Sequence, residues 1–81
     1  MKAPRGFEKA SYNGILVYKK KGAEAWKVPY VYAGRSSDIT IDRSCAGPLI
    51  LIQGACAEYH DTFEAAMESA IKHNPGALLR V

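Results

Sequence analysis

Residues 60–76 read HDTFEAAMESAIKHNPG, and this stretch decides the fold class because it holds the one convincing helix signal in the chain. Asp61 stands where an N-cap belongs, and Glu64 follows three residues later in a capping-box arrangement. Apolar residues then recur at three- and four-residue spacing, at Phe63, Ala66, Met67, Ala70 and Ile71. The Asn-Pro-Gly sequence at 74–76 ends the pattern. We therefore predict one amphipathic helix from about Asp61 to His73.

Before this helix the chain reads as strands separated by turn signals. Asn13-Gly14 lies between two stretches that can extend, which is the strongest short signal for a β-hairpin. Further turns are expected at residues 21–24 and 34–37. In residues 38–43, DITIDR, the two isoleucines alternate with polar residues and point inward. Residues 49–53, LILIQ, read as a strand that is apolar and buried on both faces.

The segment between these turns, AWKVPYVYAG at residues 25–34, carries its large side chains on one face of a strand. Those side chains are Trp26, Val28, Tyr30 and Tyr32. Pro29 has no N–H to donate to a ladder. We therefore expect this strand to lie at a sheet edge, to be bulged or to be broken in two.

Together these signals predict an α+β fold, with antiparallel strands and hairpins over the N-terminal two-thirds and the C-terminal amphipathic helix packed on the sheet. The 81 residues suit a single small domain at 7–81, with residues 1–6 as a flexible lead-in. The longest apolar run, at residues 49–52, is far shorter than a membrane span. The N-terminal sequence MKAPRGFEKA holds no apolar leader, so we expect a cytoplasmic protein with reduced thiols.

Charge is divided unevenly along the chain, whose net charge is +3. Through residue 35 there are eight basic and two acidic residues, and from residue 36 onward three basic and six acidic ones. The aromatic side chains of Tyr12, Tyr18, Trp26, Tyr30 and Tyr32 lie in the basic half, and aromatic and basic side chains on a sheet are typical of single-strand nucleic-acid platforms. The candidates for binding an anionic partner are Lys19, Lys20, Lys21, Lys27, Arg35, Tyr18, Tyr30 and Tyr32. Solvated lysines and core aromatics explain the same pattern without any ligand.

The stretch CAEYHD at 56–61 has the residue types of a cysteine-nucleophile site. Before a helix that begins at Asp61, however, Cys56 and His60 would lie about 13 Å apart along an extended chain. We read Cys56 as a small apolar filler, Tyr59 as packing beneath the helix start, and the pair as non-catalytic.

A zinc site made of Cys45, Cys56, His60 and His73 is disfavoured for a different reason. Ten residues separate the cysteines and twelve the histidines, whereas structural zinc ligands come in closely spaced pairs. We predict no catalytic residue, no metal and no cofactor.

The residues DTFEAAMESAIKH at 61–73 resemble the capped helix that follows three strands in HicB-type antitoxins. This resemblance covers thirteen of the 81 residues and rests on a common capping pattern, so no residue role is carried over. The leading functional prediction is a non-enzymatic binding or assembly module that engages a protein partner or a second copy of the chain. The alternative is single-strand or RNA binding through the basic half, and a thiol enzyme using Cys56 and His60 ranks third. We expect neither a membrane association nor a small-molecule substrate.

Overall fold

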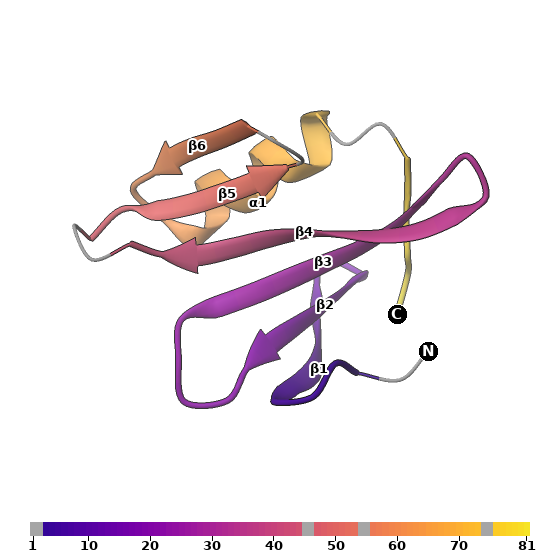
Figure 1. Ribbon diagram of the computed structural model, residues 1–81, viewed down its shortest axis with the longest axis horizontal. Helices are drawn as coiled ribbons and strands as arrows, with labels where there is room; N and C mark the ends of the chain where they lie inside the picture. The colour runs from indigo at the N-terminus through magenta and orange to yellow at the C-terminus, as the bar shows by residue number, and fades with distance from the viewer. Residues whose placement is uncertain (1–2, 45–46, 54–55, 74–75) are drawn as a thin grey trace.

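Seven strands and one helix make up the computed structural model, which describes residues 3–44, 47–53, 56–73 and 76–81 (Figure 1). The elements in chain order are β1 (Phe7–Tyr12), β2 (Ile15–Lys20), β3 (Ala25–Tyr32), β4 (Arg35–Arg43), β5 (Leu49–Gln53), β6 (Cys56–His60), α1 (Phe63–His73) and β7 (Ala77–Leu78). Strands β1 to β6 are paired antiparallel in sequence order, and β7 pairs with β3. The predicted α+β class is confirmed.

Two-residue turns build the β1–β2 and β3–β4 hairpins of this meander. Asn13 and Gly14 have φ angles of 50° and 82°, and Tyr12 pairs with Ile15 across them, so the hairpin predicted at this site is confirmed. The β3–β4 turn is formed by Ala33 and Gly34, with φ angles of 51° and 76°. The predicted turn is present, but its bounds of 34–37 are wrong, because the ladder continues to the Tyr32–Arg35 pair and β4 begins at Arg35.

The core lies between α1 and one face of the sheet. Met67, which is fully buried on the helix, packs in the same cluster as Ile39, Ile41, Leu49 and Leu51. The predicted inward alternation of the β4 isoleucines is confirmed. The expectation that both faces of β5 are buried is wrong, since Leu51 is 1% exposed but Ile52 is 42% exposed. The reason is that the helix covers only one face of β4, β5 and β6 (Figure 1).

Strand β3 lies inside the sheet, so the expectation that Pro29 marks an edge is wrong. Its eight residues pair with β4 throughout, while on the other side β2 pairs only as far as Lys27 and β7 begins at Tyr30. Pro29 thus falls where the partner on that side changes from β2 to β7. The strand itself is continuous from Ala25 to Tyr32, so the expectation of a strand broken in two is also wrong. A residue without an N–H suits this position because neither β2 nor β7 has a residue paired with Pro29 on that side.

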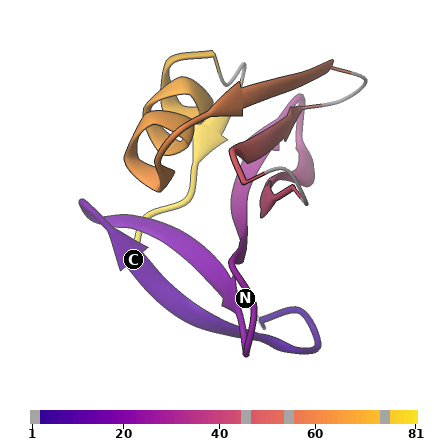
Figure 2. The same cartoon turned by 90° about the vertical axis from the view of Figure 1, so that its left-hand side faces the viewer.

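The C-terminal segment closes the gap between β3 and β2. The amide of Leu79 donates to the carbonyl of Pro29 at 3.4 Å, while the Leu79 carbonyl accepts from Leu16 at 2.9 Å. Val81 then donates to the carbonyl of Gly14 at 3.0 Å. Figure 2 shows this segment running from the helix down toward the β1–β2 hairpin. The final residues therefore tie the hairpin to the rest of the sheet.

The helix begins two residues later than expected and uses a different cap. Thr62 Oγ1 accepts from the amide of Ala65 at 3.1 Å, so Thr62 is the N-cap and the assignment of Asp61 is wrong. The cause is β6, which pairs with β5 as far as His60 and holds the chain extended. The helix ends at His73 as predicted; the expected Asn74-Pro75 terminator lies outside the described residues. In the described part of the chain, no helix is long and apolar enough to cross a membrane.

Candidate functional site

The candidate cationic residues lie mainly at the β2–β3 turn. Lys19, Lys20 and Lys21 are exposed there, and the Nζ of Lys19 lies 6.0 Å from the ring centroid of Trp26. The side chain of Lys27 is only 31% exposed, and its Nζ lies 3.8 Å from a carboxylate oxygen of Asp38. The three exposed lysines can therefore meet an anionic partner, whereas Lys27 already has a neighbouring carboxylate.

Most aromatic rings of the basic half are not open to a ligand. Tyr18 is 2% exposed, so it cannot stack on a base. Trp26 lies against Phe63 of the helix with ring centroids 4.5 Å apart, and Tyr12 meets the same ring edge-on at 5.6 Å. These contacts place both rings at the border of the core. The remaining well-exposed aromatic of this half is Tyr32, at 56%.

Three other candidates come together at the far end of β3. Tyr30, Tyr32 and Arg35 line an open hollow of about 520 Å³ beside the β3–β4 turn, and Arg35 is the direct cross-strand neighbour of Tyr32. Lys19 pairs with Trp26, six residues before Tyr32 along β3. At about 3.3 Å per residue, the lysines and the open tyrosine lie about 20 Å apart. The structure thus divides the predicted surface into two separate parts.

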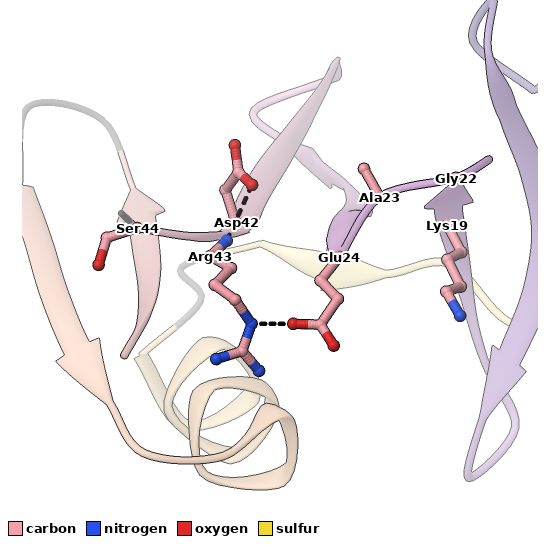
Figure 3. Close-up of a pocket in the computed structure, with 7 residues that line it drawn as sticks. All are labelled: Lys19, Gly22, Ala23, Glu24, Asp42, Arg43 and Ser44. Atoms are coloured by element: carbon pink, nitrogen blue, oxygen red, sulfur yellow. Dashed lines mark hydrogen bonds and ion pairs between the residues drawn. The ribbon is translucent and has the colours of Figure 1, made fainter. Parts of the chain in front are cut away.

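A second open hollow, of about 640 Å³, lies beside the β2–β3 turn and the end of β4 (Figure 3). It is lined by Lys19, Gly22, Ala23, Glu24, Asp42, Arg43 and Ser44. The guanidinium of Arg43 is paired with Glu24 and also donates to the carbonyl of Gly47. Figure 3 shows Lys19 standing apart from this pair. Since Arg43 is held by its own neighbours, its guanidinium is not free for a ligand, and its pairing with Glu24 ties the end of β4 to the β2–β3 turn.

Residues 56–60 of the CAEYHD stretch form strand β6. Cys56 is an exposed free thiol at one end of the strand and His60 lies at the other, about 13 Å away by strand geometry. The hydroxyl of Ser69 donates to both carboxylate oxygens of Glu58 at 3.3 Å, so its hydrogen bond goes to the carboxylate and not to His60. This arrangement contains no hydrogen-bonded nucleophile and base.

A metal centre finds no support among the described side chains either. Within residues 3–44, 47–53, 56–73 and 76–81, no three His, Cys, Asp or Glu side chains gather to hold a metal ion. Cys45, one of the four residues considered as zinc ligands, lies outside this part of the chain.

Large exposed apolar side chains of β5 and β6 lie on a surface that sequence reasoning missed. We define the β6 surface as the side chains of Ile50, Ile52, Ala57 and Tyr59, together with the outer backbone edge of β6. Ile50 pairs with Tyr59 and Ile52 with Ala57, so these four side chains share the face opposite the helix. Tyr59 is 67% exposed and Ile52 is 42% exposed. The expectation that Tyr59 packs beneath the helix start is therefore wrong.

The two edges of the main sheet differ in how they are protected. Among the described residues, no strand pairs with the outer edge of β6, the last strand in the sheet order. Edge strands are commonly guarded by lysine, proline or bulges. β1, at the opposite edge, carries exposed Lys9, whereas β6 carries exposed Glu58 and contains neither lysine nor proline. Had residues 56–60 been read as a strand, the sequence could have predicted that Ile50, Ile52, Ala57 and Tyr59 share one face of the sheet.

Comparison with protein-family models, with curated proteins and with solved structures finds no match to this chain. The resemblance of residues 61–73 to the antitoxin helix is therefore local to one capped helix. The function has to be inferred from the surface of the molecule itself.

Proposed function

We propose that the protein is a non-enzymatic assembly module that binds a protein partner through the β6 surface. The observation that carries this proposal is an unpaired edge strand, free of lysine and proline, beside exposed Ile52 and Tyr59 in the described part of the chain. An open strand edge offers backbone donors and acceptors to an incoming strand, and the flanking side chains set its specificity. Exposed large apolar side chains gathered on one face are typical of interaction sites.

The chemistry of the β6 surface favours a protein over a nucleic acid. Its side chains are apolar, and the charged residues next to it are acidic, Glu58 on β6 and Asp61 just after it. Phosphate groups would be repelled there, while a polypeptide strand can use the backbone edge. The exposed free thiol of Cys56 suits a reducing compartment, so we place this module in the cytoplasm.

The test is affinity capture from an extract of the source cells with two matched variants. Tyr59→Lys places a charge at the β6 surface, and Tyr32→Lys places the same charge on a tyrosine of similar exposure at the β3–β4 turn. We expect the partner to be retained by the wild-type chain and by Tyr32→Lys, and lost with Tyr59→Lys. Equal capture by all three proteins would exclude the β6 surface as the binding site.

A second candidate function is the binding of an anionic, base-containing partner such as single-stranded RNA. The specific observation in its favour is the hollow where exposed Tyr32 lies directly opposite Arg35. A ring that stacks a base beside a cation that meets a phosphate is the minimal unit of such recognition. Titration of single-stranded oligonucleotides at low salt tests it; binding that weakens with salt and is lost with Tyr32→Ala supports it, and a flat titration excludes it.

A further inference from the structure

We infer that the partner at the β6 surface is a second copy of this chain, joined edge to edge so that the sheet continues from β6 of one copy into β6 of the other. The inference rests on the proposed function and adds the identity of the partner. A twofold axis perpendicular to the sheet makes the two strands antiparallel and keeps the helices of both copies on one face. The open edge of each copy then supplies the partner strand that the other lacks.

Charge decides which register the two strands adopt. With Tyr59 directly opposite the partner's Tyr59, Glu58 faces the partner's His60, and His60 faces the partner's Glu58. The carboxylate of Glu58 is 44% exposed, and its contacts are long, at 3.3 Å to Ser69 and 3.9 Å to His60 of its own strand. It can therefore turn toward a neighbouring strand. An imidazole beside a carboxylate and a pair of facing aromatic rings are both favourable cross-strand neighbours.

The other twofold registers of this strand are worse. Centring the axis on Glu58 sets two carboxylates directly opposite each other, which destabilises a strand pair. Centring it on Ala57 sets Glu58 opposite the partner's Cys56 and leaves Tyr59 and His60 unpaired, whereas the Tyr59-centred register pairs these two residues and leaves Cys56 and Ala57 unpaired. The Tyr59-centred register is therefore the one in which this sequence complements itself.

The joined edge is short, and this sets the strength expected. β6 has five residues, of which Glu58, Tyr59 and His60 face the partner's strand in this register, and an interface of this size falls below the standard range for stable complexes. We therefore expect dimerisation that depends on concentration, with a dissociation constant in the micromolar range or weaker, on the order of 1–100 μM. Sedimentation velocity across this range measures it. Tyr59→Lys, which sets two like charges opposite each other, is expected to weaken dimerisation by about tenfold or more.

Single cysteines report the register directly. On a background in which Cys45 and Cys56 are serine, Tyr59→Cys brings two thiols directly opposite each other across the twofold axis, at a separation that a disulfide can bridge. Mild oxidation is expected to give a covalent dimer. Ala57→Cys is the matched control, because its two thiols would lie about 13 Å apart in this register. Crosslinking of Ala57→Cys in preference to Tyr59→Cys would overturn the register.

A charged residue on β5, one strand in from the joined edge, distinguishes edge-to-edge pairing of the two copies from face-to-face packing of their sheets. Ile52 belongs to the β6 surface but lies on β5, one strand in from the joined edge, so Ile52→Lys is expected to weaken dimerisation less than Tyr59→Lys does. If Ile52→Lys abolishes dimerisation and Tyr59→Cys does not crosslink, the copies pack face to face and the edge pairing is wrong.

The failure of self-association is distinguishable from failure of the proposed function. A chain that stays monomeric throughout the sedimentation series, yet captures a different protein in a manner lost with Tyr59→Lys, overturns the second copy as the partner and leaves the β6 surface as a binding site. A monomeric chain whose captured proteins do not respond to Tyr59→Lys overturns both.

Discussion

Gly76→Ala is the substitution whose effect on stability follows most directly from the geometry. A Cβ atom at this position would lie 2.3 Å from the carbonyl oxygen of Val31 and 2.8 Å from Cδ2 of Tyr30. Close carbon–oxygen contacts in proteins begin at about 3.3 Å, so the segment would have to move away from β3 by about 1 Å. The obstacle at Val31 is backbone, which cannot rotate aside as a side chain can.

Two estimates of the loss in the free energy of unfolding agree. Forcing an extra methyl group into a packed site costs about 1–3 kcal/mol. If the segment detaches instead, the three hydrogen bonds that join Leu79 and Val81 to Pro29, Leu16 and Gly14 are lost, at about 1 kcal/mol each. A destabilisation of about 2–3 kcal/mol lowers the Tm of a domain this small by about 10–20 °C. Thermal unfolding followed by circular dichroism measures it.

Gly22→Ala is the matched control. Gly22 has a φ of +76°, and a methyl group added there would meet no atom within 4 Å, so alanine brings backbone strain without a clash. We expect Gly22→Ala to cost about 1–2 kcal/mol, less than Gly76→Ala. A Gly76→Ala protein as stable as the wild type would show that the chain after the helix does not lie against β3.

Three further outcomes are expected. Thr62→Ala should lower the free energy of unfolding by about 1 kcal/mol in urea denaturation, and Asp61→Ala by less; the reverse order would place the cap at Asp61. Met67 is 0% exposed, so Met67→Ala should lower the free energy of unfolding by about 2–5 kcal/mol. Ile71 is 36% exposed, so Ile71→Ala should lower it by only about 1 kcal/mol. Equal losses would contradict the orientation of the helix on the sheet. Replacing the lysines at 19–21 by glutamine should leave stability within about 0.5 kcal/mol and partner capture unchanged, and a loss of capture would move the binding surface to that turn.

Much of the fold was predictable from the sequence because its signals come from residues that are close together along the chain. The Asn13-Gly14 pair specified a hairpin because its two residues readily adopt the positive φ angles that the turn requires. Ile39 and Ile41 alternate with polar residues, and their burial follows from the period of a strand. The apolar stripe around Met67 specified the helix in the same way.

Features that depend on distant parts of the chain were not predictable. Residues 56–60 form a strand because β5 pairs with them, and this pairing also delays the helix start to Phe63. Pro29 was expected at an edge, since the sequence gives no sign that the C-terminal segment replaces β2 at that point. Both errors arise from the choice of strand partners, which is a tertiary property.

The candidate site was harder to predict than the fold because the exposure of a strand residue depends on how distant parts of the chain pack against it. Tyr18 and Tyr59 both lie on strands, yet one is 2% exposed and the other 67%. Their sequence neighbourhoods suggested the opposite, since Tyr18 precedes three lysines and Tyr59 precedes the helix. The separation of the lysines from Tyr32 likewise follows from the register of β2 on β3, which no local pattern specifies.

Amide hydrogen exchange of the two edge strands, measured in dilute and in concentrated solutions of the chain, tests most directly whether β6 is the binding edge. The amides of β6 (Cys56–His60) should exchange more slowly as concentration rises, while those of β1 (Phe7–Tyr12) should not change. Slowed exchange at β1, or exchange at β6 that is independent of concentration, would contradict self-association through the β6 surface.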